Sequence, residues 1–171
     1  MLSRIFNKNN SRAISCAACC LIILLTLAFI FNNSLATREE SAEQSGQVVE
    51  VVKPIIDPNE NMSYDEVSGF VRKGAHFVEF SALGLELAIL FFIISSDFKL
   101  RDAIYSASLA LLVANTDELI QVYSERGSLV TDVFLDLGGG LFGIAAGYVI
   151  ALSVRAVYRR AKSRKETSAV T

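Results

Sequence analysis

Four apolar runs separated by polar segments dominate the pattern of hydrophobic and polar positions along this chain. They cover about residues 13–31, 74–96, 103–123 and 133–153. An α-helix rises about 1.5 Å per residue, so a run of roughly 20 residues crosses the roughly 30 Å hydrocarbon core of a membrane. The pattern therefore predicts an all-α fold class, an integral membrane bundle of four transmembrane helices.

The polar segment at residues 32–62 is rich in acidic residues, and we expect a loop there. Its first part is typical of a mobile linker, and the short valine-rich run at 48–52, followed by Pro54 and Pro58, favours an extended surface segment. Ser63 with Glu66 three positions later forms a capping box, which predicts the start of a helix. We expect this helix to lie at the membrane interface before the second span.

Positive charge is strongly segregated along the chain and predicts the orientation of the bundle. Most of the sixteen Lys and Arg residues fall before residue 13, at Lys99 and Arg101, or after residue 154. Short loops rich in Lys and Arg stay on the cytoplasmic side. The predicted topology is therefore N-in/C-in, and the expected parts are a basic N-terminus with the first span (1–31), an acidic extracytoplasmic loop (32–62), three further spans (63–154) and a basic cytoplasmic tail (155–171).

Composition excludes several classes of protein. A hydrophobic content of 52 % is too high for an ordinary soluble domain. The three cysteines, Cys16, Cys19 and Cys20, all lie in the first apolar run, so they indicate neither a disulfide framework nor a cysteine-based zinc site. A cleaved signal peptide is the alternative to a first span, because Ser34-Leu35-Ala36 offers small residues after the run. The run is longer than a usual signal core.

With this topology, polar residues from three segments gather at the outer face of the membrane. Ionisable groups inside apolar segments are costly unless they are paired or hydrated, so such a cluster is a functional-site hypothesis. The candidate catalytic residues are His76, Glu79, Asp117, Glu118 and Asp132. The candidate substrate-binding residues are Lys73, Gln121, Arg126 and Asp136.

Helical spacing places Arg72, His76 and Glu79 on one face of a helix, and residue chemistry indicates the role of each group. Asp117 or Glu118 would serve as a general base, and His76 would transfer the proton. Arg126 and Lys73 would hold an anionic group such as a carboxylate or a phosphate.

Each of these residues also has a structural interpretation. A single histidine is often a hydrogen-bonded packing residue, and Asp132 and Asp136 open a helix, where carboxylates complement the helix dipole. Arg126 could form an ion pair that ties two helices together. Glu86, farther along the second span, either lines a polar cavity or pairs with a neighbouring helix. Gly139, Gly143 and Gly147 form a small-residue stripe that lets another helix approach closely.

One imidazole and several carboxylates suit a divalent metal ion, although the spacing assigns no particular metal and no cofactor. The sequence contains no Gly-rich phosphate-binding loop and no nucleophilic Ser or Cys in a recognisable setting. No feature indicates nucleic acid as a partner.

An ordered set of short motifs resembles the VanZ-like family. These are Lys73-x-x-His76-Phe77-x-x-Phe80, Asp117-Glu118-x-x-Gln121, Arg126-Gly-Ser and Asp132-x-x-x-Asp136 before a Gly-rich span. The resemblance covers about residues 70–150 and implies a multi-pass protein of the bacterial cytoplasmic (inner) membrane that serves the cell envelope. Some members are linked to resistance to the glycopeptide teicoplanin. Many relatives have Asn where this chain has Asp136.

These observations lead to three hypotheses for the function. The first is an enzyme that modifies a lipid-linked envelope precursor or a surface glycan or lipid. The second is a membrane protein without catalytic activity that binds envelope precursors or protein partners. The third is a proton-coupled carrier using Glu79, Glu86 and Asp117. The expected partners are membrane lipids and, for the first two hypotheses, a lipid-linked precursor.

Overall fold

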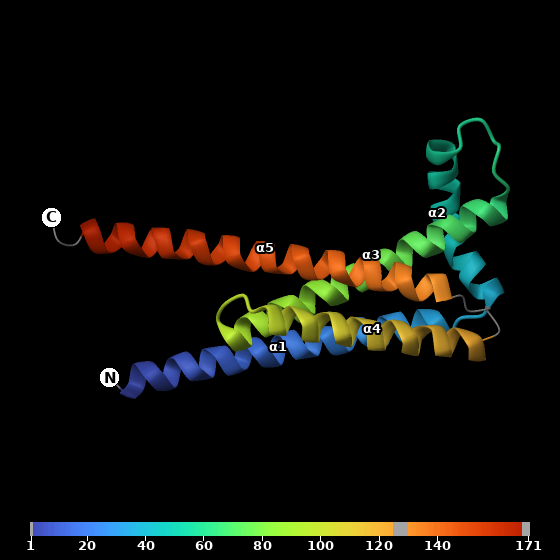
Figure 1. Ribbon diagram of the computed structural model, residues 1–171. Helices are drawn as coiled ribbons and strands as arrows, with labels where there is room; N and C mark the ends of the chain where they lie inside the picture. Colours follow the sequence, from blue (N-terminus) through green and yellow to red (C-terminus); the bar gives the residue numbers. More distant parts are fainter. Residues whose placement is uncertain (1, 125–129, 169–171) are drawn as a thin grey trace.

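The computed structural model describes residues 2–124 and 130–168, and within these ranges the chain is almost entirely helical. Four long helices lie lengthwise beside one another, and a shorter helix, α2, runs across the end of the bundle that is distant from both termini (Figure 1). The helices are α1 (Leu2–Leu35), α2 (Arg38–Ile56), α3 (Tyr64–Ser95), α4 (Leu100–Tyr123) and α5 (Val130–Ser168). The predicted all-α fold class is confirmed.

The helix α3 begins at the predicted capping box. The backbone N–H of Glu66 donates to the Ser63 hydroxyl, and the Glu66 carboxylate accepts from the Ser63 backbone N–H at 2.7 Å. The expectation of a separate interfacial helix before the second span is wrong, because α3 continues without a break to Ser95. Gly69 and Gly74 lie inside the helix, where glycine weakens but does not end it.

The expectation of an unstructured acidic linker with an extended run at 48–52 is also wrong. These residues belong to α2, which starts at a second capping box formed by Thr37 and Glu40. Val49 is fully buried, so packing outweighs the weak preference of valine for strands. Pro54 is accommodated in the last turn of the helix.

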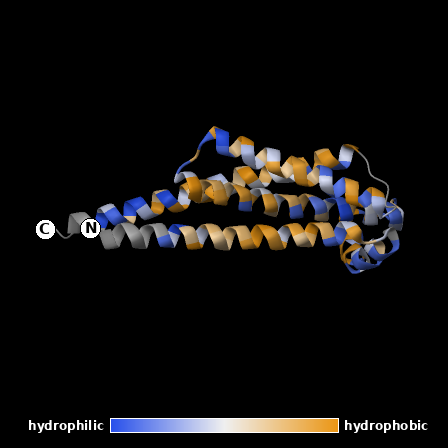
Figure 2. Ribbon diagram, turned by 90° about the horizontal axis from the view of Figure 1, so that it is seen from below, coloured by the Kyte–Doolittle hydropathy of each residue, from blue (hydrophilic) through white to orange (hydrophobic). Residues whose placement is uncertain are grey.

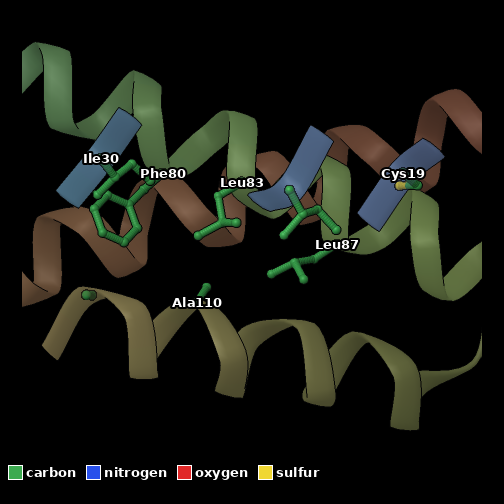
Figure 3. Packing of buried hydrophobic residues seen from close by; sticks show 8 residues of the cluster. Cys19, Ile30, Phe80, Leu83, Leu87 and Ala110 are labelled. Carbon is green, nitrogen blue, oxygen red and sulfur yellow. The ribbon is translucent and has the colours of Figure 1, made fainter. Parts of the chain in front are cut away.

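A hydrophobic core fills the space between α1, α3 and α4. Phe80, Leu83 and Leu87 of α3 follow one another along this core, with Ile30 of α1 beside Phe80 and Ala110 of α4 on the facing helix (Figure 3). Inside a membrane, such helices associate mainly through van der Waals packing, because lipid tails are as apolar as leucine. This core therefore fixes how α3 sits between its neighbours.

The helices α3 and α5 are in backbone contact along the predicted glycine stripe. A methyl group added at Gly139 or Gly143 would overlap the carbonyl oxygen of Phe77 or Ser81, respectively. One added at Gly147 would lie 2.9 Å from the carbonyl oxygen of Leu85. The stripe is thus the close-packing surface that the sequence predicts.

Polar contacts join the helices at the end of the bundle that holds both termini. Arg12 of α1 donates to the carbonyl oxygens of Ile93 (2.9 Å) and Ile94 at the end of α3. These carbonyls lack partners within the helix, so the arginine satisfies them. Arg155 of α5 lies 2.7 Å from Asp97, and this hydrogen bond lowers the pKa of the Asp97 carboxyl.

The long helices expose apolar side chains on their outer faces, including Leu24 of α1, Val78 of α3 and Phe142 of α5. Apolar residues fill the middle of these helices, and hydrophilic residues gather toward the ends (Figure 2). Among the described residues, three segments are long and apolar enough to cross a membrane: Asn10–Leu35, Tyr64–Ser95 and Val130–Arg164. The chain is a multi-pass membrane protein.

The helix α4 is not among these three segments. Its second half contains Asn115, Asp117, Glu118 and Gln121, and these residues lower its hydropathy. Its outer face is nevertheless apolar, with Ile104, Leu112 and Leu119 all exposed.

We expect Gly143→Ala to destabilise the bundle, because its methyl group would overlap the Ser81 carbonyl and force α3 and α5 apart. Overpacking of this kind costs about 1–3 kcal/mol. Gly138→Ala is the matched control, since its methyl would meet only a Phe77 ring carbon, at 4.0 Å. The thermal midpoints of the purified variants in detergent should differ, with Gly143→Ala lower. Equal midpoints would contradict the backbone contact.

Candidate functional site

Three helices each contribute one ionisable side chain to a compact cluster at the end of the bundle distant from the termini. His76 comes from α3, Asp117 from α4 and Asp136 from α5. One nitrogen or oxygen of each side chain lies within 4.8 Å of those of the other two. Asp117 and Asp136 are buried, and His76 is partly buried.

The buried face of α4 explains how an acidic group reaches the interior. Its buried positions recur every three or four residues and are small or polar throughout: Asp102, Ser106, Ala110, Ala114, Asp117, Glu118 and Gln121. Small residues let α4 pack closely against its neighbours in the middle of the bundle. The same face then carries polar side chains into the interior at each end.

Hydrogen bonds hold the Asp117 carboxylate in place. The Ser34 hydroxyl of α1 donates to Oδ1, and Gln121 Nε2 donates to Oδ2 at 2.8 Å. His76 Nδ1 lies 3.7 Å from Oδ2. The Ser124 hydroxyl donates to the Ser34 carbonyl at 2.7 Å and ties the end of α1 to α4. A fully buried carboxylate held from two helices is a fixed reference point for the rest of the cluster.

Asp136 is also buried, with 1 % of its surface exposed, but within the described part of the chain its carboxylate is not held by hydrogen bonds at both oxygens. Its Oδ2 atom is buried and has no hydrogen-bond partner among the residues that the structure describes. Asp117 belongs to the same cluster, and Glu118 lines the same cavity as Asp136. Neighbouring buried carboxylates repel one another, so the cluster requires a proton or a cation to be stable.

A cavity of about 90 Å³ opens onto this cluster from the surface. Lys73 and Asp132 lie at its mouth, with Lys73 Nζ 2.7 Å from Asp132 Oδ1 and side-chain exposures of 52 % and 23 %. The lining residues are Gly69, Arg72, Lys73, His76, Glu118, Gln121, Asp132, Leu135 and Asp136. The cavity thus has the Lys73–Asp132 ion pair at its mouth and the buried Glu118 and Asp136 in its lining, with room for a few water molecules or a small polar group.

A second, larger groove of about 490 Å³ runs along α1, α2 and α3. Apolar residues such as Phe29, Val48 and Val78 form much of its wall. Arg72 and His76 line both the groove and the cavity. The two hollows therefore meet at these side chains, so a mostly apolar surface adjoins a polar one.

The structure brings together most of the candidate residues from the sequence. Lys73, His76, Glu118, Gln121, Asp132 and Asp136 line the cavity, and Asp117 lies directly beside His76. Glu79 lies apart, because its Oε1 accepts from Asn33 of α1 at 2.9 Å and it lines only the groove. Arg126 lies outside the described residues. Glu86 pairs with a neighbouring helix, as one alternative expected, by accepting from Thr26 at 2.8 Å.

The sequence prediction missed the contribution of α1 to this site. Ser34 and Asn33 contact Asp117 and Glu79, yet they follow the first apolar run, where small polar residues are equally typical of a loop or a signal-peptide cleavage site. Their signal was that a buried carboxylate, Asp117, and a partly buried one, Glu79, both need hydrogen-bond donors. Nothing in the spacing assigned those donors to α1.

The comparisons with known proteins place the chain within one family. The family model described as VanZ/LLP1 matches residues 19–152. The match begins inside α1 and includes α2, so it extends beyond residues 70–150, which contain the motifs that resemble the family. No curated protein and no solved structure matches the chain.

We expect Ser34→Ala to destabilise the protein, because it removes the donor to a fully buried oxygen of Asp117. Leaving a buried acceptor unsatisfied costs about 1–3 kcal/mol, with more for a charged group. Ser15→Ala in the same helix is the control, since the exposed Ser15 hydroxyl bonds only to its own helix, at Ser11. Thermal unfolding in detergent should separate the two variants. Two equal midpoints would show that Ser34 does not support Asp117.

Proposed function

Because the chain belongs to the VanZ/LLP1 family, we propose that it acts at the outer face of the bacterial cytoplasmic membrane on an anionic lipid or a lipid-linked envelope precursor. The observation that carries this proposal is the junction of the polar cavity with the apolar groove at Arg72 and His76. An amphiphilic molecule needs both surfaces side by side. Its head group would enter the cavity, and its chain would lie along α1, α2 and α3.

The proposed topology has four spans with both termini in the cytoplasm. Both termini lie at one end of the bundle, while α2 and the end of α4 lie at the other (Figure 1). The apolar outer face of α4 supports α4 as a membrane span in addition to the other three long helices, since it lies alongside them. The basic residues of α1 and α5 then fall inside, and the cavity opens outside. We also propose that α1 is retained, because Ser34 supports the site.

The chemistry of the cavity favours an enzyme. Lys73 at the mouth and Arg72 in the lining would attract an anionic head group. Of the two candidate general bases, Glu118 lines the cavity, whereas Asp117 lies behind it and is held by Ser34 and Gln121. Glu118 would accept a proton from the substrate or from water, and His76, whose Nδ1 lies 3.7 Å from Asp117, would transfer it. A contribution to tolerance of glycopeptides such as teicoplanin would follow from altered envelope lipids.

Glu118→Gln should abolish the activity while preserving the fold, because it keeps the side-chain shape and removes only the basic group. The measurement is the profile of envelope lipids and muropeptides in a deletion strain complemented with each variant at equal membrane levels. Wild type and the exposed control Asp65→Asn should restore the profile, and Glu118→Gln should not. An unchanged profile in the deletion strain would contradict the enzyme and favour a protein that only binds precursors.

Reporter fusions test the proposed topology. A reporter after Ser168 and one inserted at Ser96 should both read as cytoplasmic, and one inserted at Asn59, between α2 and α3, should read as external. If α4 does not cross the membrane, the two termini must lie on opposite sides. A periplasmic signal from the C-terminal fusion would overturn the four-span arrangement.

A further inference from the structure

We propose that His76, Asp117 and Asp136 bind a divalent transition-metal ion, with Zn²⁺ favoured over Mn²⁺, next to the polar cavity. The inference concerns the site of the proposed function and rests on that function only for what the ion would do there. With an ion bound, His76 would be a ligand in place of a proton carrier, and Glu118 would remain the general base. Binding itself follows from the geometry and charge of the three side chains.

The distances fit a single ion after small side-chain rotations. One donor atom from each of the three residues lies within 4.8 Å of the others, and His76 Nδ1 is 3.7 Å from Asp117 Oδ2. Zinc binds imidazole nitrogen and carboxylate oxygen at about 2.0–2.2 Å, so two of its ligands lie about 3.4 Å apart. The three donors come from three different helices, so an ion between them would link α3, α4 and α5.

The charge of the cluster favours a cation. Asp117 and Asp136 are both buried, and the buried Glu118 lines the same cavity as Asp136. Among residues 10–37, 39–124 and 130–164, whose side chains the structure describes, no Lys or Arg forms an ion pair with Asp117 or Asp136. Lys73 pairs with Asp132. A divalent ion would offset the repulsion between these carboxylates.

Asp136 provides an independent indication. It is 1 % exposed, it belongs to the cluster, and its buried Oδ2 has no hydrogen-bond partner in the described part of the chain. Buried polar atoms almost always have partners, and a bound ion is one explanation for an exception. A metal ligand at this oxygen would supply that partner.

The surroundings of the cluster resemble those of a metal site. Carboxylates that bind metals are usually held by further hydrogen bonds, as Ser34 and Gln121 hold Asp117. Catalytic zinc ions have three protein ligands and one open position, and the adjoining cavity leaves room for water or a substrate oxygen. The imidazole disfavours Ca²⁺ and Mg²⁺, which prefer oxygen alone, and Zn²⁺ binds such a site more tightly than Mn²⁺.

The test uses the full-length protein, purified in detergent and stripped with a chelator. Zn²⁺ and Mn²⁺ are titrated separately by calorimetry, and the retained metal is counted by elemental analysis after desalting. We expect one ion per chain and tighter binding of Zn²⁺. Asp136→Asn should weaken binding by at least about 100-fold, Gln121→Ala by about 10-fold, and Asp65→Asn should have no effect.

Thermal unfolding provides a second measurement that does not depend on activity. Zn²⁺ should raise the midpoint of the wild type and not that of Asp136→Asn. Without metal, Asp136→Asn should be at least as stable as the wild type, because one like charge is removed. Absence of a stoichiometric ion, or equal binding by Asp136→Asn, would overturn the proposal. A bound ion together with an unchanged lipid profile would instead contradict the proposed function alone.

Discussion

The backbone contact between α3 and α5 is the constraint on which the rest of the structure depends. Gly139 lies against the Phe77 carbonyl, and a side chain at this position would separate the two helices. Phe77 follows His76 directly, and Asp136 precedes Gly139 by one helical turn. The distance between His76 and Asp136 is therefore set by a contact in which neither side chain takes part. The glycine stripe that packs α3 against α5 therefore also fixes the spacing of two residues of the site.

The helix α4 completes this arrangement because its pattern is inverted relative to a helix of a soluble protein. Its outer face is apolar, and its inner face carries small residues between two polar ends. In lipid this pattern is favourable, since apolar side chains gain nothing by leaving the hydrocarbon, whereas polar groups gain partners inside the bundle. Asp117 thus has Ser34 and Gln121 as donors and His76 as a neighbour, and its burial stabilises one arrangement of three helices.

The lengths of the apolar runs predicted the long helices. The charges of the loops between the runs predicted that the polar groups of three segments lie at the same face of the membrane. The sequence could not predict how each helix is rotated. His76 and Glu79 are three positions apart and were expected to share a face, yet His76 lies beside Asp117 and Glu79 contacts Asn33. Three residues correspond to about 300° of rotation, so such a pair differs by about 60° and can meet different neighbours.

The errors at the ends of helices have a related cause. The valines of α2 favour strands in isolation, and the burial of Val49 on folding helps to make the helix preferable. The continuity of α3 through Gly69 and Gly74 likewise depends on its capping box at one end and its core at the other. The local pattern shows neither the burial of Val49 nor the packing of the α3 core. The capping box of Ser63 and Glu66 was predicted, because its two partners lie within four residues of each other.

The position of the core relative to the cluster argues for a site that serves one side of the membrane. Phe80 is fully buried one helical turn beyond His76, and Leu83 and Leu87 continue the apolar packing toward the other end of the bundle. A carrier would need polar groups or water along that path. Glu86 lies on it, but its carboxylate accepts from Thr26 of α1, which makes it part of the contact between α1 and α3. The cavity and the groove at Arg72 and His76 therefore suit a molecule that approaches from the membrane surface, binds there and leaves the same way.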